Sequence, residues 1–260
     1  MRSFLALLLF PSILSAQSAM VQIEENMVSG VYRIEVSDKN NTSSYCGTAF
    51  IAEYKHKCYL ITAKHLFLTY SLADSVNIKI NEGSKQNSYK MQVYFDGTPE
   101  SSDIAVLPIF THVERQNIAC DLDTPLTEVK MGDPILYLGF PSTLTTYENV
   151  SFNTVDRSGN ISPLVKRGYF SGYDYRSTKN SIAIFDTQNT SGFSGSPVFV
   201  YSSTLNKKGI FAVLTAGVNA NIKVSEGHNL KTVTDMFYMT GLSYGSLIGY
   251  ATLIIDNLIK

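Results

Sequence analysis

Short stretches in which apolar and polar residues alternate are the dominant pattern along the 260-residue chain. Such stretches are typical of β-strands when they are rich in β-branched and aromatic residues and are bounded by turn formers. Long amphipathic helical patterns are absent, and only the last stretch, 252–260, has the pattern of a helix. The sequence predicts an all-β protein, with strands at 30–36, 47–54, 58–63, 76–80, 90–95, 103–110, 134–140, 181–187, 196–201 and 210–218.

The segment 112–133 contains no clear strand and divides this pattern near the middle of the chain. A weakly patterned segment between two strand-rich halves is typical of a linker between two units of similar size. We therefore expect an N-terminal β unit at 19–120 and a C-terminal β unit with the terminal helix at 121–260.

The first 18 residues have the layout of a secretory signal peptide. Arg2 precedes an apolar run from Phe4 to Leu14, and small residues follow this run. Pro11 and the Ser/Ala-rich end fit poorly with a buried helix. We expect cleavage after Ala16, Ser18 or Ala19 and a mature protein that is secreted or periplasmic.

The amino-acid composition argues against one class of binding partner, nucleic acids. Hydrophobic residues make up 44% of the chain and charged residues 17%, which is enough apolar content for a packed core. The formal net charge of −1 lacks the excess of Lys and Arg that nucleic-acid-binding domains carry. A nucleic-acid partner is therefore not expected.

The segment Phe237–Ile255 contains no charged residue, and Gly241, Gly245 and Gly249 recur in it at intervals of four. This spacing resembles the small-residue packing motif of membrane helices. Seven hydroxyl-bearing residues in the same segment are a polar load that a spanning helix does not favour. Two core strands are the preferred interpretation, and a membrane anchor is not expected.

The three cysteines, Cys46, Cys58 and Cys120, allow at most one internal disulfide. Cys46 and Cys58 flank a predicted hairpin and form the favoured pair, and free buried cysteines are the alternative. Metal binding by His56, Cys58 and His65 is not expected, because no second ligand set completes a tetrahedral site.

Three polar residues at strand ends are candidates for catalysis. His65 follows the strand that ends in "LITAK", Asp103 begins "DIAVLPI", and Ser194 lies in "SGFSGSPVF". Their chain order, His then Asp then Ser, is that of the chymotrypsin type of catalytic triad. The α/β-hydrolase alternative fails, because its G-x-S-x-G motif requires Gly where this chain has Ser196.

The sequence resembles the chymotrypsin-fold (trypsin-like) serine peptidases, and within them the bacterial HtrA-type and glutamyl-endopeptidase-type domains. "ITAKH", "SSDIAVL" and "SGFSGSP" are similar to the three motifs of this family, and no PDZ-like module follows. The resemblance implies two six-stranded antiparallel β-barrels with a short C-terminal helix. It also implies a serine endopeptidase that cleaves protein or peptide substrates without a cofactor or metal.

Each residue of the implied triad has a chemical role. Ser194 would attack the substrate carbonyl, while His65 would accept its proton and return it to the leaving amine. Asp103 would fix the tautomer of the imidazole. The backbone N–H groups of Gly192 and Ser194 would form the oxyanion hole, and the absence of a Cβ lets Gly192 adopt the dihedrals that this requires.

By the same resemblance, two segments form the substrate-binding site: Gln188, Asn189 and Thr190, and Thr215, Ala216 and Gly217. Gln188 stands where trypsin-like enzymes place the Asp that selects Lys or Arg. Leu214 stands near the His of glutamyl endopeptidases. A neutral or small substrate side chain is therefore expected.

The chain departs from animal relatives of the family at Phe193, where those proteins carry an Asp that pairs with a newly cut N-terminus. Activation by this ion pair is therefore not expected. A catalytically inactive trypsin-fold protein that binds peptides or partners is the alternative function. The sequence does not indicate an oligomeric state.

Overall fold

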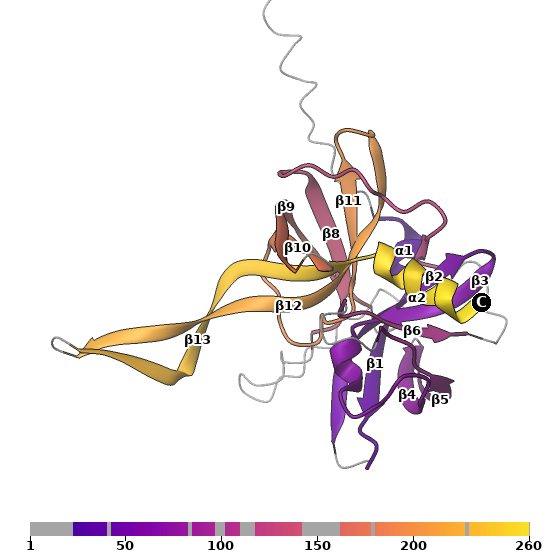
Figure 1. Cartoon of the computed structure of the whole chain (residues 1–260), viewed down its shortest axis with the longest axis horizontal. Helices are drawn as coiled ribbons and strands as arrows, with labels where there is room; N and C mark the ends of the chain where they lie inside the picture. Colours follow the sequence, from indigo (N-terminus) through magenta and orange to yellow (C-terminus); the bar gives the residue numbers. More distant parts are fainter. Residues whose placement is uncertain are drawn as a thin grey trace, which may run out of the picture.

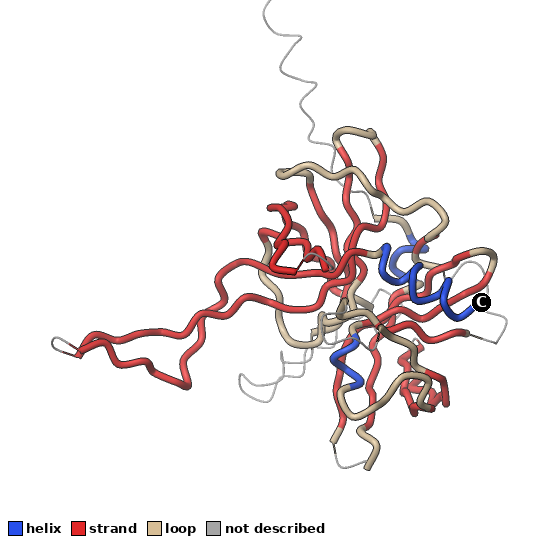
Figure 2. The backbone as a smooth tube through the Cα atoms, viewed as in Figure 1, coloured by secondary structure: helices blue, strands red, loops and turns tan. Residues whose placement is uncertain are grey.

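The computed structural model describes residues 23–40, 43–82, 85–96, 102–109, 118–141, 162–177, 180–226 and 229–259. Figure 2 shows that most of this chain is strand and that the helices are short. The two sheets contain the strands between Val31 and Leu247, and an 11-residue helix, α2 (Gly249–Ile259), follows them. The predicted all-β fold with a short C-terminal helix is confirmed.

The N-terminal sheet has seven strands. Six follow one another in the order β5-β4-β1-β2-β3-β6, and β7 pairs in parallel with β2. A single antiparallel bridge between Tyr94, two residues beyond β5, and Val106 of β6 joins the two edges. The sheet therefore curls back on itself around its own apolar core. Its strands are β1 (Val31–Ser37), β2 (Ser44–Tyr54), β3 (Lys57–Thr62), β4 (Ser75–Glu82), β5 (Lys85–Gln92), β6 (Ala105–Pro108) and β7 (Cys120–Asp121).

The C-terminal sheet is a closed barrel of six strands in the order β10-β13-β12-β11-β8-β9. All its ladders are antiparallel. The strands are β8 (Pro134–Gly139), β9 (Leu164–Ser177), β10 (Asn180–Asp186), β11 (Pro197–Ser202), β12 (Lys207–Glu226) and β13 (Asn229–Leu247). The division of the chain at residue 120 remains a prediction.

Strands β12 and β13 extend far beyond the barrel as a two-stranded ribbon (Figure 1). The ladder from β11 ends at Val213, and the ladder from β10 covers only residues 242–246 of β13. Beyond these points, within the described residues, the two strands pair with each other. The predicted strand at 210–218 is thus the barrel portion of a 20-residue strand.

Three groups of buried side chains form the core. One fills the curled N-terminal sheet and another fills the closed barrel. The third lies between the two sheets, and the apolar face of α2, with Ala251, Ile254 and Ile255, packs into it. Although α2 follows the last barrel strand, it also lies beside β2 and β3 of the N-terminal sheet (Figure 1). The two sheets therefore share one continuous interface.

The segment Phe237–Ile255 was predicted to form two core strands, but it contains the end of one strand and most of a helix. Its first part completes β13, and its second part is α2, which begins at Gly249. Within the described residues, no helix is long and apolar enough to cross a membrane.

The favoured disulfide is also wrong, because Cys46 and Cys58 are both free thiols. Cys58 faces Glu53 across the β2–β3 hairpin, seven positions from Cys46 along β2. Seven strand residues span about 23 Å, whereas a disulfide requires Cα atoms within about 7 Å.

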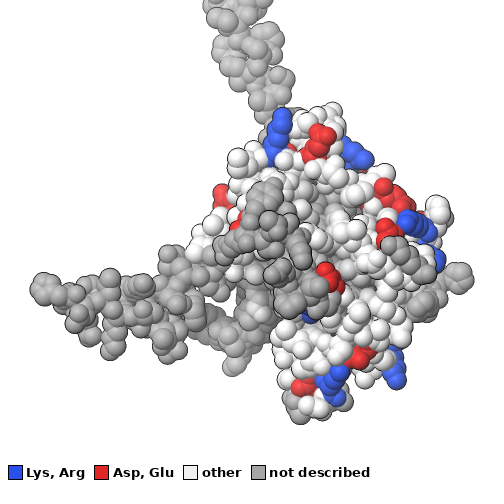
Figure 3. Space-filling view, in the orientation of Figure 1, with Lys and Arg blue, Asp and Glu red and all other residues white. Residues whose placement is uncertain are grey.

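Charged side chains do not gather by sign on the face drawn in Figure 3. Among the described residues, blue and red groups are interspersed along the margins, and most of the remaining surface is uncharged. This distribution agrees with the near-neutral formal charge of the chain.

Candidate active site

The structure brings His65 and Asp103 into direct contact. His65 lies in the short 3-10 helix η1 (Lys64–Phe67), which directly follows β3, and Asp103 lies two residues before β6. The ring atom Nδ1 of His65 is 2.7 Å from Asp103 Oδ2, and the backbone N–H of His65 donates to Asp103 Oδ1 at 2.8 Å. Because an ionised carboxylate only accepts hydrogen bonds, Nδ1 carries the hydrogen and Nε2 is left as the basic atom.

Asp103 is itself fixed by the second sheet. Its backbone N–H donates to the hydroxyl of Ser246, on β13, at 3.1 Å. Its carbonyl oxygen accepts a hydrogen bond from the backbone N–H of Lys64 at 3.3 Å. The imidazole and its carboxylate are therefore held on the side that faces the closed barrel.

Ser194 occupies a tight turn directly before β11. The flanking residues Gly192 and Gly195 have φ angles of +95° and +91°, which glycine adopts far more readily than other residues. The turn is closed by hydrogen bonds from Phe193 N–H to the Thr190 carbonyl oxygen and from Ser196 N–H to the Phe193 carbonyl oxygen. Small residues surround Ser194 because the backbone needs these conformations.

The turn lies against the segment that leads to His65. The Ser194 carbonyl oxygen accepts a hydrogen bond from Thr48 N–H at 2.8 Å. A Cβ on Gly195 would come within 2.0 Å of the Thr48 carbonyl oxygen and 3.1 Å of the backbone nitrogen of Ala63, two residues before His65. A Cβ on Gly47 would come within 2.5 Å of Leu66 and 3.0 Å of the Ser194 carbonyl oxygen. Ser194 and His65 thus belong to one tightly packed region.

The hydroxyl of Ser194 donates to the carbonyl oxygen of Thr215 at 3.4 Å. This distance is near the upper limit for a hydrogen bond, so the contact holds the side chain weakly. Among the described residues, this hydroxyl forms no hydrogen bond with His65. A rotation about the Cα–Cβ bond of Ser194 would be needed to turn its hydroxyl from the Thr215 carbonyl oxygen toward His65.

Two backbone N–H groups in the turn are not engaged. Within the described part of the chain, neither Gly192 N–H nor Ser194 N–H donates a hydrogen bond. The Gly192 carbonyl oxygen is occupied, because it accepts a hydrogen bond from Thr48 Oγ1 at 2.8 Å. The turn therefore offers two donors that a ligand oxygen can use.

The residues predicted to bind substrate lie on both sides of this turn. Gln188 has an exposed side chain, and Asn189 is buried, with 7% of its surface exposed. Asn189 Oδ1 and Thr190 Oγ1 are buried and have no hydrogen-bond partner within the described residues. Gly217 lies opposite Asn189, since a Cβ on this glycine would be 3.3 Å from Asn189 Cβ.

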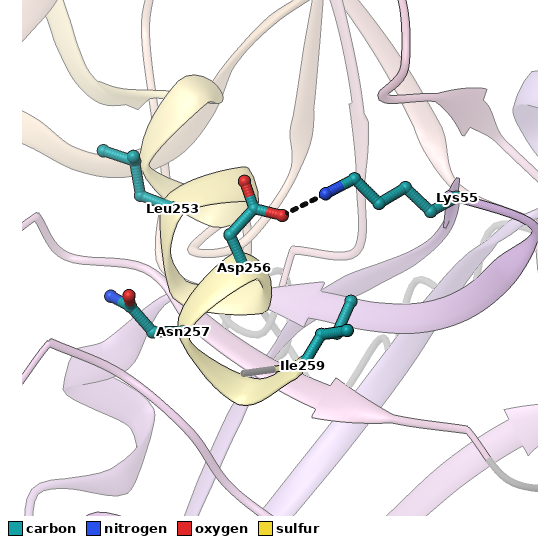
Figure 4. Close-up of a pocket in the computed structure, with 5 residues that line it drawn as sticks. All are labelled: Lys55, Leu253, Asp256, Asn257 and Ile259. Carbon is teal, nitrogen blue, oxygen red and sulfur yellow. Dashed lines mark hydrogen bonds and ion pairs between the residues drawn. The ribbon is translucent and has the colours of Figure 1, made fainter.

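A surface pocket lies elsewhere, beside α2 (Figure 4). Lys55 points from the β2–β3 turn toward Asp256, and the two side chains form an ion pair of 2.6 Å. The pocket contains none of the predicted site residues; it is lined by Lys55, Leu253, Asp256, Asn257 and Ile259.

Two supporting residues were not identified from the sequence. Thr48 and Ser246 form hydrogen bonds across the interface between the sheets. Thr48 belongs to the predicted strand 47–54, but alternation along a strand does not reveal which other strand its side chain meets.

Comparison with known proteins supports the fold. No protein-family model matches the chain, and neither does any curated protein. Among solved structures, the chain is similar to the active form of the Rv3671c protease from M. tuberculosis, with a TM-score of 0.52 and 13% identity. This match covers 88% of our chain and 80% of that chain. An inactive form of Rv3671c protease aligns with a TM-score of 0.48 and 12% identity over 88% of each chain. The match to the active form shows that the chain shares the fold of that protease.

Proposed function

We propose that this protein is a serine endopeptidase that uses His65, Asp103 and Ser194 as its catalytic triad. The observation that carries the proposal is the double hydrogen bond between His65 and Asp103 beside the turn of Ser194. An imidazole oriented by a carboxylate acts as a general base, and a serine hydroxyl at neutral pH needs such a base to become a nucleophile. The protease fold supports a protein or peptide substrate.

In the proposed mechanism, Ser194 leaves the Thr215 carbonyl and turns toward Nε2 of His65 when a substrate is bound. Nε2 accepts the hydroxyl proton as the oxygen attacks the substrate carbonyl, and Asp103 stabilises the imidazolium that results. The unengaged N–H groups of Gly192 and Ser194 donate hydrogen bonds to the negatively charged oxygen that forms from the substrate carbonyl. The imidazolium then protonates the leaving amine as the C–N bond breaks, which leaves an acyl ester on Ser194. Water, deprotonated by His65, attacks this ester, and the carboxylic acid product leaves as Ser194 recovers its proton.

The side chain accepted next to the cleaved bond is proposed to be neutral. The six residues that the resemblance assigns to substrate binding include no charged side chain: Gln188, Asn189, Thr190, Thr215, Ala216 and Gly217. Asn189 Oδ1 and Thr190 Oγ1 are buried polar atoms that a ligand could pair.

The same proposal places the mature protein in the periplasm or outside the cell, because residues 1–18 have the layout of an export signal. The test therefore uses mature protein recovered from the exported fraction. We expect a fluorophosphonate probe to label it covalently on Ser194. Labelling should disappear in Ser194→Ala and slow by at least about 100-fold in His65→Ala, because the general base is lost.

Ser203→Ala is the control, since it removes an exposed hydroxyl from the turn after β11, outside the candidate site, and it should label like the parent. Circular dichroism checks that each variant is folded. If the folded, mature parent is not labelled, the peptidase proposal is wrong. The protein would then be a non-catalytic binder built on the same fold.

A further inference from the structure

A lysine ammonium lies on the face of the aromatic ring that precedes the proposed nucleophile. Lys166 Nζ is 4.8 Å from the centroid of the Phe193 ring, and it also donates to the carbonyl oxygen of Gln188 at 3.1 Å. A cation at this distance over a ring face is attracted by the negative charge of the π system. One side chain thus contacts both ends of the segment 188–194, which we call the oxyanion loop.

Tyr137 completes a closed set of contacts around this loop. Its hydroxyl donates to the same Gln188 carbonyl oxygen at 2.5 Å, and its ring packs edge-on against Phe193 with centroids 5.4 Å apart. Tyr137 and Lys166 face each other directly in the β8–β9 ladder. Two neighbouring barrel strands therefore hold the two ends of the loop together.

The contacts of Lys166 are specific to the loop. Within the described residues, Lys166 forms no salt bridge, and its polar partner is the Gln188 carbonyl oxygen. Burial lowers the pKa of Lys166, which agrees with an ammonium group partly removed from water. Phe193 is fully buried, so the cation lies against a ring with little freedom to move.

We propose that Lys166 is a positioning residue that orders the oxyanion loop, so that the N–H groups of Gly192 and Ser194 point to one place. This inference rests on the proposed peptidase function. The ammonium links Phe193, which lies between the two donors, to Gln188 at the start of the loop. Without the ammonium, the Gln188 carbonyl oxygen still accepts a hydrogen bond from Tyr137. Gln188 and Phe193 are then connected only through the packing of the Tyr137 ring against the Phe193 ring.

The test compares Lys166→Met and Lys166→Arg in the full-length chain. Methionine keeps an unbranched apolar side chain against Phe193 and removes the cation, whereas arginine keeps a cation that can stack on the ring. Arg167→Met is the matched control, because it removes a positive charge from the adjacent position, whose side chain points to the other face of β9.

Two readouts are measured. Hydrogen exchange of a peptide covering 188–196 should be about tenfold faster in Lys166→Met and unchanged in the other two variants. With a peptide substrate, kcat should fall about tenfold in Lys166→Met while KM changes less than about twofold, because the donors act on the transition state. Lys166→Arg should restore kcat to within about twofold of the parent.

Unchanged exchange and unchanged kcat in Lys166→Met would overturn the proposal. So would a Lys166→Arg variant as impaired as Lys166→Met, or faster exchange spread evenly over the whole chain. If the parent shows no fluorophosphonate labelling, the peptidase function fails. The exchange experiment still decides whether Lys166 orders the loop.

Discussion

Gly195, the residue after the proposed nucleophile, has no room for a side chain. Its φ angle is +91°, and a Cβ would come within 2.0 Å of the Thr48 carbonyl oxygen and 2.2 Å of Thr62 Oγ1. Both oxygens are held in place, because Thr62 Oγ1 donates to the Thr48 carbonyl oxygen at 2.6 Å. The close approach of the turn to the N-terminal sheet therefore requires glycine.

Gly132 allows the steric effect to be separated from backbone strain. It has a similar φ of +89°, and no atom lies within 4 Å of the position its Cβ would take. We expect Gly132→Ala to lower the free energy of unfolding by about 1 kcal/mol through strain alone. Gly195→Ala should lower it by at least about 3 kcal/mol, because overpacking adds to the strain. Urea unfolding of both variants measures the difference, and equal losses would contradict the packing argument.

Three residues of the proposed site were predicted from short motifs that are each tied to one chemical role. His65, Asp103 and Ser194 each lie at a strand end, which the sequence indicated, and the structure pairs the first two. Lys166 could not be predicted in the same way. Its role depends on Phe193 and Gln188, which are distant in the chain and reach it only through folding of the barrel.

At the scale of elements, strands β1 and β4 are joined by a charged pair as well as by their ladder. Glu35 and Lys79 face each other in register, and Lys79 Nζ is 2.9 Å from Glu35 Oε1. The hydrogen bond from Lys79 holds the pKa of Glu35 below its ordinary value. A carboxylate whose pKa is lower in the folded state stabilises the fold above its unfolded pKa, and this stabilisation is lost as the pH falls.

Glu35→Gln should therefore lower the free energy of unfolding by about 0.5 kcal/mol at pH 7, a small value because both side chains are partly exposed. The difference from the parent should be smaller at pH 3 than at pH 7, because the stabilisation is lost as the pH falls through the lowered pKa of Glu35. Urea unfolding at both pH values checks this. Glu128→Gln, at an exposed loop position, should show no such dependence, and a difference that grows at pH 3 would refute the pairing.

Elements with a continuous apolar run were predictable, whereas those whose pattern is interrupted or extends beyond the barrel were not. The strands at 47–54 and 134–140 have continuous apolar runs and appear as expected. β9 was missed because Lys166, Arg167 and Gly168 interrupt its apolar pattern. The full length of β12 was missed because the part beyond the barrel pairs with β13 outside the sheet that encloses the core.

At the scale of the whole molecule, Thr48 of β2 connects the two sheets through the candidate site. Its hydroxyl donates to the Gly192 carbonyl oxygen at 2.8 Å and accepts from Phe140 N–H at 3.0 Å, and its own N–H donates to the Ser194 carbonyl oxygen. Thr48 is fully buried. The hydroxyl therefore satisfies two backbone groups that water does not reach.

Thr48→Val should lower the free energy of unfolding by about 2–4 kcal/mol, because it leaves a buried carbonyl and a buried N–H unpaired. Thr48→Ser keeps the hydroxyl and loses one methyl group, so it should cost about 1 kcal/mol. Guanidinium unfolding of both variants measures this difference. Equal stability of the two would show that the hydroxyl does not hold the sheets together.

The hydrogen bond between Asp103 and Ser246 has a consequence for biosynthesis. The two residues are 143 positions apart, and Ser246 belongs to the last strand of the barrel. A ribosome must therefore finish nearly all of the second sheet before the support of the imidazole–carboxylate pair can form. Under the proposed function, the carboxylate that orients the general base therefore gains its support from the second sheet only at the end of synthesis.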